Sequence, residues 1–139
     1  MNENADWIDV HRLFARYAFA LDSGDADGIV SCFHPQGSLE SPVLGKIEGH
    51  ANIADFARRF AGLQRGGAQL RHVITNLQVE RHGDTARASA YLSTFLTHNG
   101  ETRVLPPGVY DCELAKAESG WVFMTRMLRM DATYTLPFK

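Results

Sequence analysis

The second half of the chain consists of long segments typical of β-strands, separated by short turns. The four segments are "LRHVITNLQVER" (70–81), "ARASAYLSTFLTH" (86–98), "GVYDCELAKA" (108–117) and "WVFMTRMLRMDATYTL" (121–136). The motifs "HGDT", "NGET" and "ESG" supply residues that tight turns prefer. Strands joined by such short connections must pair antiparallel, because a parallel pairing needs a crossover of a dozen or more residues. The sequence therefore predicts an antiparallel meander.

The first half is predicted to be mainly helical. Apolar residues at spacings of three and four predict a helix over about 6–21 and another over about 51–64. A short helix is expected over about 26–33, with Asp25 or Ser23 as its cap. The motif "HPQG" is expected to break the chain, before short strands near 38–40 and 46–48. Helices followed by a meander indicate an α+β fold, which we assign to one domain spanning residues 1–139.

Composition and charge exclude several classes of partner. The net charge of −2 gives no reason to expect nucleic acid or an anionic membrane. No apolar run approaches the ~20 residues that span a bilayer, and "MNENADW" lacks the features of a signal peptide. We therefore expect a cytoplasmic protein in which Cys32 and Cys112 are reduced and buried, although a disulfide between them is not excluded.

Both alternating phases of the last predicted strand carry large apolar residues. Trp121, Phe123 and Met127 occupy one phase. Met124 and Leu128 fall in the other phase. A sheet with one face in water should be more one-sided than this. We therefore expect one face to pack on the helices and the outer face to form a homodimer or a higher homo-oligomer.

No strong motif for cofactor chemistry is present. The sequence has no glycine-rich phosphate loop and no G-x-S-x-G motif, and none of its six histidines is paired with another ligand at metal-binding spacing. We therefore expect no metal and no cofactor. Two possibilities remain for this chain: acid–base chemistry on an organic substrate, or no catalysis.

Three residues stand out, although each also has an ordinary structural interpretation. Asp22 ends an apolar helical run, where the helix dipole disfavours a carboxylate, but aspartate is also common in turns. His72 lies near the start of a long strand, where a hydrogen-bonded core histidine is more frequent than a catalyst. Tyr17 lies on the buried helical face, where core packing explains it equally well.

The whole chain resembles SnoaL-like proteins of the nuclear transport factor 2-like superfamily. The resemblance rests on length, element order and four segments: "LFARYAFALDSGDADGIVSCF", "GKIEGHANIADFARRF", "RHVITNLQVERHGDTARASAYL" and "SGWVFMTRMLRMD". It implies a strongly curved antiparallel sheet, a cystatin-like α+β barrel, wrapped against three helices around a cone-shaped, mostly apolar pocket. Such a pocket suits an apolar cyclic small molecule.

The site pattern is most similar to that of bile-acid 7α-dehydratase, scytalone dehydratase and hexachlorocyclohexane dehydrochlorinase. The resemblance implies that His72 is a general base, that Asp22 orients it, and that Tyr17 donates a hydrogen bond to a substrate oxygen. It thus implies a cofactor-independent lyase or isomerase of dehydratase type. A non-catalytic binding protein, or a small subunit like that of ring-hydroxylating dioxygenases, is the alternative.

Further residues are predicted to line the pocket, with core packing as the alternative for each. No clear equivalent of the dehydrochlorinase's strand arginine is present. Arg126 and Arg129 are candidates, and because they occupy opposite phases of the last strand, at most one of them faces the pocket. The predicted lining residues are Phe33, Asn76, Tyr91, Phe95, Tyr110, Phe123, Met127 and Arg129.

Overall fold

The computed structural model describes residues 3–133, in which helices and strands follow one another in the expected order. The helices are α1 (Glu3–Ser23), α2 (Ala26–Ser31) and α3 (Gly49–Arg65). The strands are β1 (Phe33–Ser41), β2 (Gly45–Glu48), β3 (Gln69–His82), β4 (Thr85–His98), β5 (Glu101–Val104), β6 (Gly108–Ala117) and β7 (Gly120–Met130). Of the predicted last strand, residues 134–136 lie outside the described residues.

The strands form one sheet in the order β2-β1-β7-β6-β4-β3, and β5 pairs with β4. The predicted meander is confirmed, since β3, β4, β6 and β7 pair antiparallel in turn. The sheet is nevertheless mixed and open, because β1 and β7 pair in parallel and β2 and β3 remain as edges. A parallel pair is possible there because most of the chain, from β2 to β6, runs between the two strands. The α+β class is confirmed: three helices pack on one seven-stranded sheet.

Two local predictions about connections were wrong. The motif "HPQG" does not break the chain but lies within β1, whose pairing with β7 shifts register between Phe33 and Ser38. Pro35 lies in this irregular segment, outside the part of β1 that pairs with β2 (Ser38–Ser41), and a bulge tolerates a proline. Strand β5 was not predicted, because only four residues follow the turn that begins at Asn99. The prolines at 106 and 107 then separate β5 from β6.

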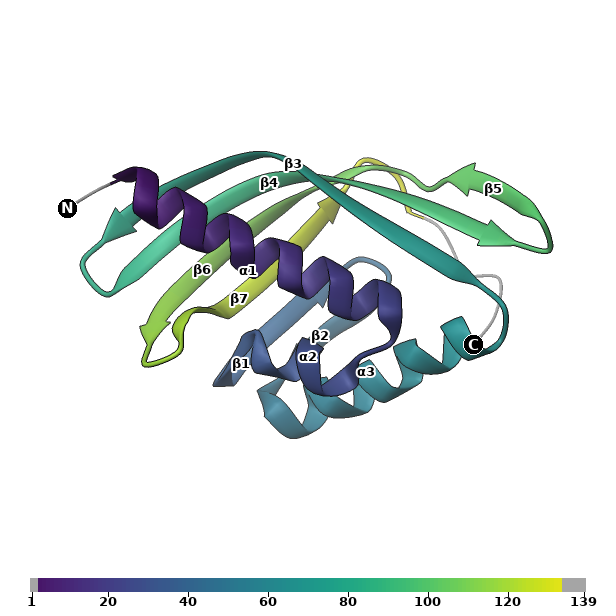
Figure 1. The fold of residues 1–139 in the computed structure, drawn as a ribbon, viewed down its shortest axis with the longest axis horizontal. Helices are drawn as coiled ribbons and strands as arrows, with labels where there is room; N and C mark the ends of the chain where they lie inside the picture. Colours follow the sequence, from purple (N-terminus) through teal and green to yellow (C-terminus); the bar gives the residue numbers. More distant parts are fainter. Residues whose placement is uncertain (1–2, 134–139) are drawn as a thin grey trace.

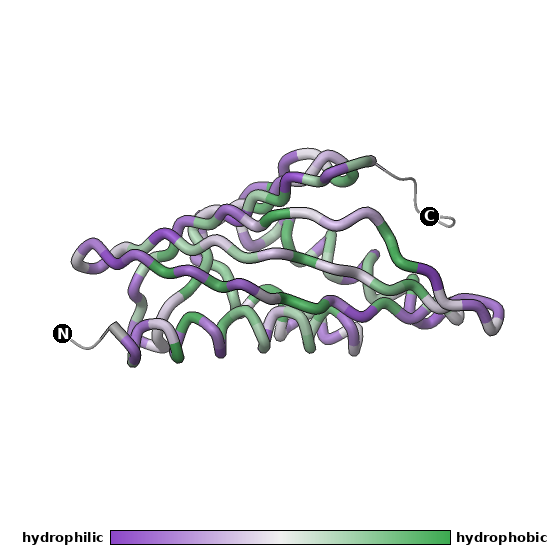
Figure 2. The backbone as a smooth tube through the Cα atoms, turned by 90° about the horizontal axis from the view of Figure 1, so that it is seen from above, coloured by the Kyte–Doolittle hydropathy of each residue, from purple (hydrophilic) through white to green (hydrophobic). Residues whose placement is uncertain are grey.

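The long strands arch over α1 (Figure 1), and hydrophobic and hydrophilic positions alternate along them (Figure 2). The buried apolar residues of the helices and strands form one core cluster. At the centre lies a cluster of four aromatic rings: Phe14, Tyr17, Phe33 and Phe123. Their ring centres are 5.2 to 5.7 Å apart, in edge-on or tilted arrangements that aromatic pairs prefer. The cluster fixes α1 against β1 and β7, so it sets where the last turn of α1 meets the sheet.

Candidate active site between helix α1 and strand β3

The end of α1 determines where Asp22 points. Two backbone hydrogen bonds close the helix. The N–H of Asp25 donates to the Ala20 carbonyl (2.9 Å), and the N–H of Gly24 donates to the Leu21 carbonyl (3.3 Å). This is the Schellman pattern, which needs a left-handed residue, and Gly24 supplies it with φ of +71°. Asp22 therefore lies in the last turn of α1, one residue before the helix ends at Ser23. Since the Asp25 side chain caps α2 by accepting from the Gly28 N–H (2.9 Å), Asp22 is not needed as a cap.

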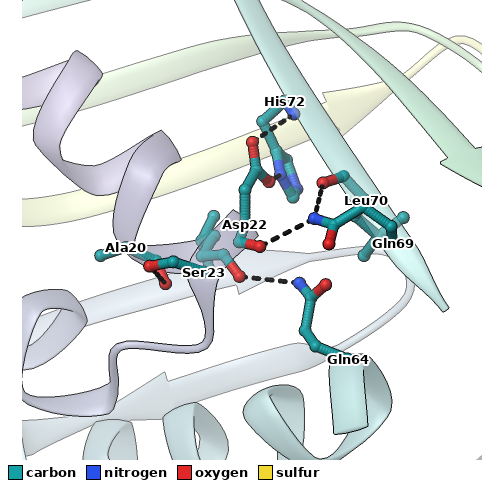
Figure 3. A network of polar contacts seen from close by, with 8 residues as sticks. Ala20, Asp22, Ser23, Gln64, Gln69, Leu70 and His72 are labelled. Carbon is teal, nitrogen blue, oxygen red and sulfur yellow. Dashed lines mark hydrogen bonds and ion pairs between the residues drawn. The ribbon is translucent and has the colours of Figure 1, made fainter. Parts of the chain in front are cut away.

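The Asp22 carboxylate contacts His72 twice (Figure 3). One oxygen lies 2.6 Å from Nδ1 of the imidazole, and the other accepts the backbone N–H of His72 at 3.1 Å. Both side chains are only 10% exposed. Because a carboxylate can only accept hydrogen bonds, the Nδ1 atom carries the proton and Nε2 of the neutral ring keeps a free lone pair. The ring is therefore oriented as a general base requires.

Two glutamines hold the helix end in place, and the sequence contained no signal for them. Nε2 of Gln69 donates to the Asp22 carbonyl (2.8 Å), and Nε2 of Gln64 donates to the Leu21 carbonyl (2.9 Å). The last carbonyls of a helix lack partners within the helix. Gln64 of α3 and Gln69 of β3 supply donors to two of these carbonyls. The helix end that carries Asp22 is therefore held from both sides.

His72 forms part of the wall of a cavity between the sheet and the helices. The cavity encloses about 640 Å³ of space free of atoms, counted with its open mouth, but only about 60 Å³ admits the centre of a water molecule. It is therefore narrow. Its wall is mostly apolar, with Leu21, Phe56, Phe60, Leu92 and Leu128 among the lining residues. A mostly apolar wall with a few polar groups is the usual character of a small-molecule site.

The polar groups on the same cavity are few. Besides His72, the polar residues that line it are Tyr17, Ser41, Thr94, Tyr110 and Arg126. Burial raises the pKa of the Tyr17 hydroxyl above its ordinary value, while the positive charge of Arg126 opposes that shift. Tyr17 is therefore a hydrogen-bond donor throughout the neutral range. His72, Tyr17 and Arg126 come from three different elements, and the fold brings them to one cavity.

The structure places several predicted lining residues on the outer face of the sheet. His72 pairs with Thr94 on the inner face, so Tyr91 and Phe95, at odd offsets from Thr94, point the other way. Met127 and Arg129 point outward for the same reason, at odd offsets from buried Arg126. Tyr91 is 55% exposed. As lining residues these four were wrong, and Arg126 is the arginine that faces the cavity.

The remaining predicted lining residues divide into three groups. Tyr110 lines the cavity. Phe33 and Phe123 are fully buried, but they belong to the ring cluster behind Tyr17 and do not reach the cavity wall. Asn76 is exposed at an irregularity in the β3–β4 pairing, where its φ is +59°. A left-handed asparagine serves the bulge rather than the site.

Within residues 3–133, no group of three or more metal-ligating side chains comes together. In the same range, no helix has both the length and the apolar character needed to cross a bilayer.

A model of the SnoaL-like domain family matches residues 3–127. The chain belongs to this family. Domains of this kind often are enzymes of the polyketide cyclase or dehydratase type. A search of curated proteins finds no match for this SnoaL-like chain.

Solved structures share the fold of the SnoaL-like chain. A variant of a protein of unknown function from Mycobacterium tuberculosis is 25% identical, with a TM-score of 0.80 over 91% of this chain and 72% of that one. An NTF2-like protein with a cystatin-like fold from Novosphingobium aromaticivorans is 23% identical, with a TM-score of 0.81 over 93% and 84%. A protein described as a putative aromatic ring hydroxylase, also from Novosphingobium aromaticivorans, is 24% identical, with a TM-score of 0.81 over 96% and 94%.

Proposed function

We propose that this protein is a cofactor-independent lyase or isomerase of dehydratase type, acting on a hydrophobic cyclic small molecule. The observation that carries the proposal is the contact of 2.6 Å between Asp22 and Nδ1 of His72, at the wall of an apolar cavity. An oriented imidazole with one free nitrogen is the usual general base for removing a proton near neutral pH.

The positions of the three side chains support the following reaction. Nε2 of His72 takes a proton from a carbon next to a carbonyl, and the electron pair of the C–H bond forms an enolate. Tyr17 donates a hydrogen bond to the enolate oxygen, which stabilises the developing charge. Asp22 stabilises the imidazolium that forms. The enolate then expels a hydroxyl group from the next carbon, which leaves as water with the proton from His72. In an isomerase the same proton returns to another carbon.

The first step can be tested without the natural substrate. We use 2-tetralone, a cyclic ketone with acidic α-protons, and follow exchange of those protons for deuterium in D₂O by ¹H NMR. The protein should accelerate the exchange. His72→Gln should lower the rate by about 10²–10⁴-fold, because general-base catalysis contributes that much. Tyr17→Phe should also lower it, because the enolate loses its donor.

The matched control is His82→Gln, which removes an exposed histidine at the end of β3. It should exchange protons at the wild-type rate. If His72→Gln retains the wild-type rate while its thermal unfolding is unchanged, His72 is not the base. If 2-tetralone binds but wild type does not accelerate exchange, the alternative of a non-catalytic binding protein is supported instead.

The second alternative is an assembly subunit. The structural neighbour described as a putative aromatic ring hydroxylase is the finding that favours it. A subunit of that kind should co-purify with a larger oxygenase component. The buried Asp22–His72 pair supports the enzyme more strongly, because a purely structural subunit has no need of a free imidazole nitrogen at a cavity.

A further inference from the structure

Arg126 is a buried cation on the cavity wall. It lies in β7, beside Cys112 of β6 and Leu39 of β1, and is only 3% exposed. Arginine is almost never buried to this extent unless its charge is paired. The cost of removing a guanidinium from water must therefore be compensated by its surroundings.

No carboxylate supplies that compensation. Within residues 3–133, no aspartate or glutamate forms an ion pair with Arg126, and no acidic residue lines the cavity. The Nε atom of Arg126 is buried without a hydrogen-bond partner. Arg81 provides the contrast. Its side chain is more exposed than that of Arg126, and yet its Nη1 atom lies 2.9 Å from Oδ1 of the Asp6 carboxylate. The charge of Arg126 thus lacks a counter-ion within the described chain.

Two tyrosines hold the guanidinium in position. Its central carbon lies 5.3 Å from the ring centre of Tyr17 and 5.0 Å from that of Tyr110. Contacts of this kind stabilise a cation partly and limit its movement, and the Tyr110 hydroxyl also interacts with Arg126. Neither tyrosine neutralises the charge. The result is a pre-oriented planar cation on the same cavity as His72.

We propose that the ligand of this cavity carries a carboxylate on its cyclic apolar body, and that Arg126 binds this carboxylate. A guanidinium matches a carboxylate through paired N–H donors, and its aromatic surroundings exclude competing water. The inference rests on the proposed function for the cavity as a substrate site, and it narrows the substrate from apolar molecules to apolar acids. Arg126 acts as a specificity residue in this arrangement, while His72 remains the base.

The test compares acids with their neutral amides, which have nearly the same shape. The probes are benzoate with benzamide, and 2-naphthoate with 2-naphthamide, each titrated into the protein by isothermal calorimetry at pH 7. Each acid should bind about ten- to a hundredfold more tightly than its amide, the range expected for a hydrogen-bonded charge pair. Equal affinities within both pairs, or no binding of any of the four probes, would overturn the proposal.

Variants distinguish this proposal from the catalytic one. Arg126→Met should lower the ratio of acid affinity to amide affinity to about one. Arg126→Lys should keep part of the wild-type ratio, because the positive charge remains. Arg129→Met, which removes a cation on the outer face, should leave the preference unchanged. His72→Gln should also keep the preference, since the base does not bind the carboxylate. If Arg126→Met fails to fold, the comparison of acid and amide on the wild-type protein decides.

The two proposals can fail separately. Loss of deuterium exchange with an intact preference for acids would refute the catalytic role and leave the ligand class standing. Exchange without any preference for acids would refute the role of Arg126 alone.

Discussion

Replacing Asp22 by asparagine tests the arrangement around His72 directly. The carboxylate accepts two N–H donors, one from the imidazole at 2.6 Å and one from the His72 backbone at 3.1 Å. An asparagine has one acceptor oxygen and one donor NH₂ group. If its oxygen keeps the backbone N–H, its NH₂ group faces Nδ1, which must then give up its proton. The proton moves to Nε2, and the free lone pair at the cavity is lost.

The expected magnitudes follow from the same contacts. Loss of the base at Nε2 should reduce the rate of proton abstraction by about 10²–10⁴-fold. Stability should fall by roughly 1–3 kcal/mol, because a partly buried charge-assisted hydrogen bond is lost. Removing a negative charge from the last turn of α1 stabilises the folded state by about 0.3–1 kcal/mol, because the helix dipole disfavours that charge. The hydrogen bond is the larger effect at the middle of each range, so the variant should be destabilised by roughly 0–2.7 kcal/mol, with a central value of about 1.4 kcal/mol.

The tautomer is the quantity to measure. A long-range ¹H–¹⁵N correlation spectrum of the histidine rings should show the proton on Nδ1 in wild type and on Nε2 in Asp22→Asn. Urea unfolding gives the stability change. The control is Asp27→Asn, an exposed acid in the first turn of α2, which should leave the tautomer unchanged and lower stability by no more than about 0.3–1 kcal/mol, because it removes only a favourable interaction with the helix dipole. A wild-type spectrum with the proton on Nε2, or the same tautomer in both proteins, would refute the reasoning.

Two further predictions concern the rest of the molecule. Burial raises the pKa of the Cys32 thiol to about 11 and that of Cys112 to about 12, whereas thiols of the unfolded chain ionise near 8.5. The unfolded chain loses its thiol protons first, so the stabilisation is complete below about pH 8 and declines as the pH rises toward 11. Each thiol loses roughly 2 kcal/mol of stabilisation between pH 8 and pH 10, so urea unfolding at the two pH values should differ by about 4 kcal/mol, and Cys32→Ala should halve that difference. The outer sheet face exposes Tyr91 (55%) and Met127 (40%), an apolar area that we propose is covered in a homodimer. Light scattering after gel filtration should show a dimer that Tyr91→Glu with Met127→Glu converts to a monomer, and a monomeric wild type would contradict this.

The order and type of the main elements could be predicted from the sequence, because periodicity and turn residues are local signals. Strand β6 begins and ends at the predicted residues. The parallel pairing of β1 with β7 could not be predicted, since it depends on where α2 returns the chain to the sheet. The bulge that retains "HPQG" in β1 depends on β7 as its partner, and no local pattern carries that information.

The face on which each strand residue lies was the weakest part of the prediction. Tyr91, Phe95 and Met127 were assigned to the pocket because large apolar residues are usually buried. Their orientation follows instead from register: once His72 is paired with Thr94 on the inner face, every second residue of β4 points outward. The identity of Asp22 and His72 as partners came from the family resemblance. Spacing alone cannot bring residues 50 positions apart into contact.

The position of β3 explains why the carboxylate is found at the end of a helix. β3 is an edge strand, paired only with β4, so some of its N–H groups face away from the sheet. The N–H of His72 is one of these, and Asp22 accepts it in place of a further strand. One oxygen of Asp22 thus attaches α1 to the sheet edge, while the other orients the imidazole. The unfavourable helix dipole is tolerated because the same side chain closes an edge of the fold and prepares the candidate base.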